Sequence, residues 1–183
     1  MEKEQVPLCN ENDEVIGAVD KDYLHQFVKS GKIKPYHRSV QIFILNSKME
    51  LLVHKTSENK GEDKGGKWTI SASGHVMAGE NYEDGAVREV KEETSIKIKK
   101  RDLRVLTTFK GGDYSGWEHA MVYYIITDKK PIMNAEASDW FYAQLKDVKE
   151  KLDKKELPFS KVFKALFKPL WARMSKAGEM VKI

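Results

Sequence analysis

The sequence predicts an α/β or α+β protein, and three observations lead to this fold class. Short runs of aliphatic and β-branched residues, separated by turn residues, predict strands. A capped segment with helical spacing follows a glycine-containing bend, and an amphipathic segment lies near the C-terminus. These signals mix irregularly along the chain and do not alternate as they would in a doubly wound parallel sheet.

The first third of the chain predicts two pairs of strands. In "VPLCNENDEVIGAVDK" two short strands flank a turn at residues 10–13, which predicts an N-terminal β-hairpin. A helical or irregular link follows, up to about residue 35. In "RSVQIFILNSKMELLVHK" two further strands flank a turn at residues 46–48, and Val40–Leu45 has the composition of a buried central strand.

The middle of the chain predicts a loop, a strand and a helix in close succession. Residues 56–66 are polar and rich in glycine and lysine, so we expect a mobile loop there and interpret it as a lid. The segment "WTISAS" predicts one strand that leads to Gly74. Asn81 is a suitable N-cap, so the next helix is expected to run from about Tyr82 to Thr94.

The last third predicts further strands and two helices. "LRVLTTFK" and "AMVYYIIT" have strand composition, and "DWFYAQLKDV" predicts a strand that enters a short helix near Asp147. Apolar residues at helical spacing in "PFSKVFKALFKPLWARM" predict a C-terminal amphipathic helix, with a kink expected at Pro169.

Composition narrows the class of protein. The 183 residues favour one domain with terminal extensions, and 40% apolar with 33% charged residues is typical of a soluble globular chain. The net charge of +4 is spread along the chain, which does not indicate nucleic acid binding and fits a basic pocket for an anion. No apolar run is long enough to cross a membrane, and the N-terminus lacks a secretory signal. With Cys9 as its single cysteine the chain forms no internal disulfide, so we expect a cytoplasmic protein.

Three carboxylates are concentrated at one end of the predicted helix. Glu89 lies three residues before Glu92 and four before Glu93, so the three side chains share one side of the helix. Like charges at this spacing repel unless a cation lies among them, and hard oxygen ligands suit Mg²⁺ or Mn²⁺. The alternative interpretation is a solvated face of a charged helix.

The stretch "GHVMAGENYEDGAVREVKEETSI" resembles the Nudix box, G-x5-E-x7-R-E-U-x-E-E-x-G-U, in which U is a bulky aliphatic residue. The matching positions are Gly74, Glu80, Arg88, Glu89, Val90, Glu92, Glu93 and Ile96. The one departure is Ser95, where the family has the glycine that ends the helix.

The resemblance implies a Nudix-type α/β/α sandwich with a mixed β-sheet, the N-terminal hairpin as an extension and a C-terminal helix. It implies a Nudix domain at residues 36–152, between an extension at 1–35 and a helical extension at 153–183. By position, Glu92 and Glu93 would hold Mg²⁺ or Mn²⁺, and Glu89 would hold metal or activate water. Arg88 would orient a glutamate, and Gly74 and Glu80 would support the turn.

The stretches "VIGAVDKDYLHQ", "YHRSVQIFILN", "LLVHKTSENK" and "GKWTISASGH" give a second, narrower resemblance. They resemble isopentenyl diphosphate isomerases, which share the Nudix fold. By position, the histidines and glutamate of their metal site would correspond to His25, His37, His75 and Glu118. Those isomerases use a cysteine where this chain has Ser73, and they lack the complete hydrolase box. For His37 and His75 a structural role is the alternative to metal binding.

The sequence therefore predicts a metal-dependent Nudix hydrolase that cleaves a diphosphate bond in a nucleoside diphosphate derivative or similar small molecule. An isomerase and a catalytically silent nucleotide-binding module are the alternatives. Lys55, Lys60 and Lys67, with Glu118, are candidate substrate-binding residues, although lysines beside a charged loop are also commonly solvated. Tyr114 and Trp117 are candidates to stack on a base. The two terminal extensions are candidate contacts of a homodimer.

Overall fold

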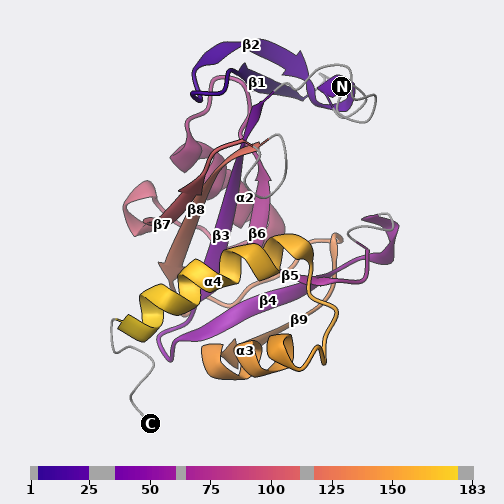
Figure 1. The fold of residues 1–183 in the computed structure, drawn as a ribbon, viewed down its shortest axis with the longest axis vertical. Coiled ribbons are helices and arrows are strands. Elements are labelled where there is room, and N and C mark those ends of the chain that lie inside the picture. Colours follow the sequence, from indigo (N-terminus) through magenta and orange to yellow (C-terminus); the bar gives the residue numbers. More distant parts are fainter. Residues whose placement is uncertain (1–3, 25–35, 61–64, 112–117, 177–183) are drawn as a thin grey trace.

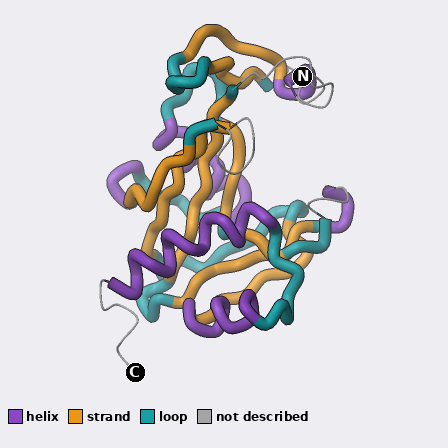
Figure 2. Tube along the Cα trace, viewed as in Figure 1, coloured by secondary structure: helices purple, strands orange, loops and turns teal. Residues whose placement is uncertain are grey.

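The computed structural model describes residues 4–24, 36–60, 65–111 and 118–176. A two-stranded antiparallel sheet near the N-terminus precedes a seven-stranded sheet with helices on both faces (Figures 1 and 2). The strands are β1 (Gln5–Cys9), β2 (Val15–Asp20), β3 (His37–Leu45), β4 (Glu50–Thr56), β5 (Trp68–Thr69), β6 (Ala72–His75), β7 (Arg104–Phe109), β8 (Glu118–Ile126) and β9 (Ala137–Gln144). The helices are η1 (Glu58–Lys60), α2 (Tyr82–Thr94), η2 (Lys100–Asp102), α3 (Leu145–Asp153) and α4 (Lys161–Lys176).

The large sheet is mixed, as predicted. Its main path is β5-β4-β3-β8-β7, with β6 paired to β3 and β9 paired to β4. The β3–β8 pair is parallel, whereas the other pairs are antiparallel. In the register between β3 and β4, only Leu45 and Leu51 are partners, so the two strands separate beyond their turn.

Two cores lie on opposite faces of the sheet, which gives the predicted α/β/α layers. On one face, Ala86 and Val90 of α2 pack against Val40 and Ile42 of β3. On the other face α4 covers Phe43 and Leu45 of the same strand (Figure 1). Alternate residues of β3 therefore enter alternate cores, as the two-residue period of a strand requires. The α4 residues that enter the core are Phe163, Leu166, Phe167, Leu170 and Met174.

The prediction of one strand at residues 68–73 was wrong, because the segment forms two short strands. β5 pairs with β4, whereas β6 pairs with β3. Ser71 lies between them, and its Oγ donates to the Leu52 carbonyl at 2.6 Å and accepts from the Ile44 N–H at 2.8 Å. This buried hydroxyl takes the place of ladder hydrogen bonds where the chain changes partner. Sequence composition alone does not signal such a change.

The helix predicted at Tyr82–Thr94 has those bounds as α2. The Asn81 side chain accepts from the Asp84 N–H at 2.9 Å and caps the first turn. Ser95 ends the helix in the left-handed conformation with φ 58°, and its N–H donates to the Lys91 carbonyl at 2.9 Å. Ser95 thus adopts a conformation that glycine adopts with less strain.

The C-terminal helix is also confirmed, and α4 continues through Pro169 to Lys176. Ser160 precedes α4, and its Oγ accepts from the Phe163 N–H at 3.0 Å. No helix in the described ranges is both long and apolar enough to span a membrane.

The N-terminal hairpin is confirmed, and hydrogen bonds to Asp13 connect it to the main sheet and to α2. Arg38 of β3 donates from Nε to the Asp13 carboxylate at 2.7 Å, and Tyr82 of α2 donates to the same carboxylate at 3.0 Å. His119 of β8 adds a hydrogen bond from Nε2 to the Asn10 carbonyl at 2.8 Å. The division at residues 35 and 152 stays a prediction, as does a lid at 56–66, of which residues 61–64 lie outside the described ranges.

Candidate active site

The carboxylates of Glu89 and Glu93 lie one helical turn apart on α2 and are both buried, with 8% of each residue exposed. Glu92 is more exposed and lies beside them on the helix. All three line one cleft of about 520 Å³. The structure therefore brings together the three glutamates that the sequence predicts as metal ligands.

The backbone of β6 approaches these carboxylates closely. A Cβ added to Gly74 would lie 2.1 Å from Oε1 of Glu89, well inside van der Waals contact, so a side chain at this position would displace the carboxylate. The neighbouring Ser73 N–H donates to Oε2 of Glu93 at 3.3 Å. Glycine at the start of the motif is thus explained by the space that Glu89 needs.

Arg88 connects the parts of the motif. Its guanidinium makes a bidentate pair with Glu80, at 2.9 and 3.0 Å, and donates to the His75 carbonyl at 2.7 Å. The remaining donor reaches Glu89 at 2.6 Å and Glu92 at 3.0 Å. Arg88 therefore holds the β6–α2 connection against α2 and orients Glu89.

Arg88 and the Met77 N–H keep Glu80 ionised. Burial opposes the charge of Glu80, but hydrogen bonds from Arg88 and from the Met77 N–H lower its pKa below the usual range. Burial likewise opposes the charge of Arg88, yet the hydrogen bonds to Glu80 and Glu89 raise its pKa. Glu80 and Arg88 thus form an ion pair beside the cleft.

Glu89 and Glu93 are in the opposite electrostatic situation. Burial raises the pKa of Glu89 to about 7, against the lowering effect of Arg88, with Glu92 adding to the rise. Burial and the nearby Glu89 raise the pKa of Glu93 to about 8. A divalent cation would reverse both effects, because it would offset the repulsion and favour the ionised carboxylates.

The donor set fits Mg²⁺ or Mn²⁺. Carboxylate oxygens are the ligands these hard cations prefer, and Glu89, Glu92 and Glu93 present them at one wall of the cleft. Burial raises the pKa of both Glu89 and Glu93 although Arg88 contacts Glu89, so ionisation of both carboxylates is unfavourable without a further positive charge. The residues present therefore suit a divalent cation.

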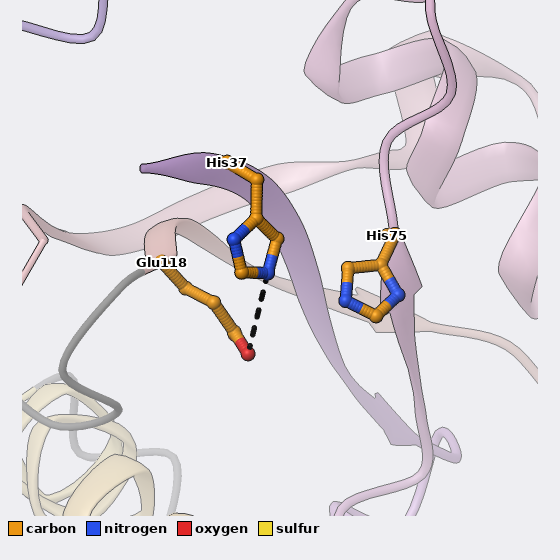
Figure 3. Close-up of side chains that lie close together, drawn as sticks. All are labelled: His37, His75 and Glu118. Carbon is orange, nitrogen blue, oxygen red and sulfur yellow. Dashed lines mark ion pairs between the residues drawn. The ribbon is translucent and has the colours of Figure 1, made fainter. Parts of the chain in front are cut away.

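A second group of possible metal-ligand atoms lies on strands β3, β6 and β8. His37 of β3, His75 of β6 and Glu118 of β8 each offer one atom, and these atoms lie within 4.8 Å of one another. In Figure 3 the His37 ring lies between the Glu118 carboxylate and the His75 ring. Nε2 of His37 is 3.8 Å from Oε1 of Glu118, and the two rings are 5.0 Å apart. One metal ion could be held by this group, and His25 lies outside the described residues.

The cleft includes some predicted substrate contacts and not others. Glu118 and Lys60 line it, and Lys60 forms an ion pair with Glu136. The other two predicted lysines, Lys55 and Lys67, are not among the described residues that line it. Nζ of Lys55 lies 3.6 Å from Oε1 of Glu58, and binding of phosphate by any of the three lysines stays a prediction. Tyr114 and Trp117 lie outside the described residues.

Several cleft residues have no motif that sequence reasoning could use. Lys21 reaches the cleft from the N-terminal segment and pairs with Glu4 at 2.7 Å. Gln41 lies between Val40 and Ile42 in β3, and His54 follows the apolar residues 51–53 of β4. These interruptions of apolar runs are the only signals that the two residues give.

Comparison with known proteins decides the family. The sequence model described as NUDIX domain matches residues 35–166, more than half of the chain. The chain belongs to the Nudix family. Its Nudix box is the segment in which Gly74, Arg88 and the glutamates meet, and enzymes of this family generally use divalent metal ions.

The relatives include both an isomerase and a hydrolase. The isopentenyl-diphosphate Delta-isomerase of Pectobacterium atrosepticum is 29% identical over 151 residues, which cover 81% of this chain and 80% of the relative. An uncharacterised Nudix hydrolase of Listeria monocytogenes is 33% identical over 97 residues, 52% of this chain and 53% of the relative. The crystal structure of DR0079 from Deinococcus radiodurans has a TM-score of 0.71 at 24% identity, covering 90% of this chain and 98% of that one. The solved structure confirms the Nudix fold, and the NUDIX domain match and the Listeria relative support the assignment as a Nudix hydrolase.

Proposed function

We propose that this Nudix protein hydrolyses a diphosphate bond in a nucleoside diphosphate derivative or similar small molecule, with Mg²⁺ or Mn²⁺ held by Glu89, Glu92 and Glu93. The observation that carries the proposal is the close approach of Gly74 to Glu89 beside the buried Glu93, in a cleft large enough for a small ligand. A solvated charged helix would not bury two of its glutamates next to each other.

The reaction adds water across one P–O–P bridge and releases two phosphate-bearing products. When bound, the cation would neutralise diphosphate charge and help generate a nucleophile from water near neutral pH. Arg88 holds Glu89 in place, and the Ser73 N–H orients Glu93. Glu89 and Glu93 are both placed to accept the proton of the attacking water, because both carboxylates face the cleft.

A panel of diphosphates tests this proposal. Purified protein is incubated with Mg²⁺ and with nucleoside diphosphate sugars, dinucleoside polyphosphates and nucleoside diphosphates, and phosphate-containing products are measured. We expect hydrolysis of at least one class, abolished by a chelator and restored by Mg²⁺ or Mn²⁺. The absence of metal-dependent cleavage across the panel would refute the proposal.

Isopentenyl diphosphate isomerisation is the second candidate function, favoured by the group of His37, His75 and Glu118 and by the isomerase-named relatives. Ser73 argues against it, because a serine hydroxyl is a far poorer acid or nucleophile than a cysteine thiol. We expect no conversion of isopentenyl to dimethylallyl diphosphate with Mg²⁺ present. Clear conversion would make the isomerase the better assignment.

A further inference from the structure

One face of the sheet changes from apolar to polar where α4 no longer covers it. On β3, Phe43 and Leu45 lie under α4, and Ser39 and Gln41 continue the same face beyond it. Ser160, just before α4, borders the cleft, and both Ser39 and Gln41 line it. The uncovered part of this face therefore forms a floor of uncharged hydrogen-bonding side chains.

Ser39 and Gln41, with His54 of β4, which also lines the cleft, are buried, and each has a polar atom without a partner among the described residues. Ser39 is 2% exposed, Gln41 6% and His54 5%. Within the described parts of the chain, Oγ of Ser39, Oε1 of Gln41 and Nδ1 of His54 have no hydrogen-bond partner. Such atoms are rare in folded proteins, because an unsatisfied buried polar group lowers stability. Three in one cleft point to a ligand that completes them.

The polar floor adjoins the glutamates. In the register of β3 and β6, Gln41 is opposite Ser73, and Ser39 is opposite His75. Ser73 donates to Glu93, and Gly74 packs against Glu89. Ser39, Gln41 and the three glutamates line the same cleft, so a group attached to a diphosphate at the glutamates would reach Ser39 and Gln41.

We propose that Ser39, Gln41 and His54 bind a hydroxyl-bearing group, a sugar or polyol, that is linked to the scissile diphosphate. This inference rests on the proposed hydrolase function and adds the class of substituent. Oε1 of Gln41 requires a hydrogen-bond donor, and Oγ of Ser39 both donates and accepts, which hydroxyl groups match. Burial lowers the pKa of His54 to about 4, so this imidazole is neutral and suits an uncharged partner.

The rest of the cleft argues against a hydrocarbon substituent. Of the described residues that line it, only Met77 and Val162 have apolar side chains. An alkyl or prenyl chain would leave the three buried polar atoms unpaired and would find little apolar surface. A site that hydrogen-bonds a substrate hydroxyl strongly rejects an analogue without that hydroxyl. An apolar pocket discriminates much less between ligands that differ by one methylene group.

Matched ligand pairs test the inference. ADP-ribose, UDP-glucose and CDP-glycerol are each compared with the n-pentyl diphosphate ester of the same nucleoside, which keeps the base and diphosphate but lacks the hydroxyls. Binding is measured by calorimetry with Mg²⁺ on Glu93→Gln protein, so that turnover does not interfere, and hydrolysis is measured on the parent. At least one hydroxyl-bearing member should bind at least tenfold more tightly than its pentyl partner.

Gln41→Met and Ser39→Ala should remove this preference, lowering affinity for the hydroxyl-bearing ligand about tenfold and changing pentyl-ester binding less than twofold. The melting temperature of ligand-free Gln41→Met should be unchanged or higher, since a buried unpaired acceptor is removed. Gln144→Met is the matched control, because Gln144 lies at the end of β9 and donates to the Lys48 carbonyl outside the cleft. Its ligand preference should equal that of the parent.

The outcomes separate the two proposals. Equal or weaker binding of the hydroxyl-bearing member in all three pairs, including no binding at all, would overturn the inference. If the pentyl esters and the hydroxyl-bearing ligands are hydrolysed at equal Mg²⁺-dependent rates, the inference is also overturned, but the hydrolase function is supported. A clear binding preference that the variants abolish, without hydrolysis of any pair, would support the inference and count against the hydrolase function.

Discussion

At the scale of single residues, two opposite electrostatic arrangements lie side by side on α2. The guanidinium of Arg88 donates hydrogen bonds to Glu80, Glu89 and the His75 carbonyl. These bonds stabilise the connection between β6 and the helix. Glu93 instead has a backbone N–H at 3.3 Å and a neighbouring carboxylate that raises its pKa. The first arrangement stabilises the fold, whereas the second opposes ionisation of Glu93 unless a cation offsets the charge.

Gly74→Ala should lower the rate of hydrolysis much more than the stability of the fold. The added methyl group would collide with the end of the Glu89 side chain, which can rotate away, so we expect a loss of stability below about 1 kcal/mol. Displacement of this carboxylate should lower metal-dependent hydrolysis by roughly 10- to 100-fold. Urea unfolding and initial rates measure the two effects. Gly17→Ala, on β2 with open space around its Cα, is the control and should leave the rate unchanged.

The metal-free stability should fall as pH rises, because of Glu93. Its pKa is about 8 in the folded protein and near the ordinary glutamate value of 4.5 in the unfolded chain, so the folded state favours the protonated form. The stabilising contribution is present below pH 4.5 and is lost between about pH 4.5 and 8, by up to a few kcal/mol. In a chelator, Glu93→Gln should therefore unfold at higher urea concentration than the parent at pH 8, with a smaller difference at pH 5. A difference that does not depend on pH would contradict the assignment.

At the scale of elements, α2 connects the motif to the fold. Its N-cap at Asn81 and its end at Ser95 fix the length of the helix, and Ala86 and Val90 fix the face that enters the core. The glutamates are thereby placed at the cleft wall by packing and capping that do not involve them.

Ser95→Gly should stabilise the protein by about 0.5–1 kcal/mol. Ser95 has φ 58°, a conformation that costs most L-residues about 1–2 kcal/mol, and the greater freedom of an unfolded glycine offsets part of the gain. Urea unfolding measures the change. Ser175→Gly, inside α4, is the matched control and should destabilise by about 0.5 kcal/mol. Destabilisation by Ser95→Gly would show that the serine hydroxyl has a role of its own.

The elements also show what the sequence could predict. The bounds of α2 were predictable because capping and spacing signals are local, and so was the meeting of Glu89, Glu92 and Glu93. The break at Ser71 and the cleft position of Gln41 depend on which strands become neighbours, which local patterns do not encode. Lys21 reaches the cleft because the hydrogen bonds of Asp13 hold the hairpin against the sheet.

At the scale of the whole molecule, the cleft is assembled from distant segments of the chain. The N-terminal segment contributes Glu4 and Lys21, α2 contributes the glutamates, and the start of the C-terminal region contributes Ser160 and Val162. Asp13 joins the hairpin to β3 and α2 at once, through Arg38 and Tyr82. Docking of the hairpin and the shape of the cleft are therefore coupled.

Asp13→Asn tests this coupling while keeping a residue that tolerates the positive φ of 70°. Loss of the charge weakens the hydrogen bonds from Arg38 and Tyr82, so we expect a loss of about 1–2 kcal/mol in the free energy of unfolding. The hydrolysis rate should also fall several-fold, because Lys21 and Glu4 are held less firmly. Asp22→Asn, at an exposed position in the same segment, is the control for both measurements. An unchanged rate in a destabilised Asp13→Asn protein would show that the hairpin does not shape the cleft.

The central claim is that Glu89, Glu92 and Glu93 serve a divalent cation, and one paired measurement tests it most directly. The parent, Glu93→Gln and Glu83→Gln, a control on the first turn of α2, are compared for Mg²⁺-dependent hydrolysis and for thermal unfolding with and without Mg²⁺. Glu93→Gln should lose at least roughly a hundredfold in rate, be at least as stable as the parent without metal, and gain less stability from Mg²⁺. Glu83→Gln should resemble the parent in its rate and in its response to Mg²⁺. A Glu93→Gln protein that is less stable without metal and yet retains its activity would contradict the claim.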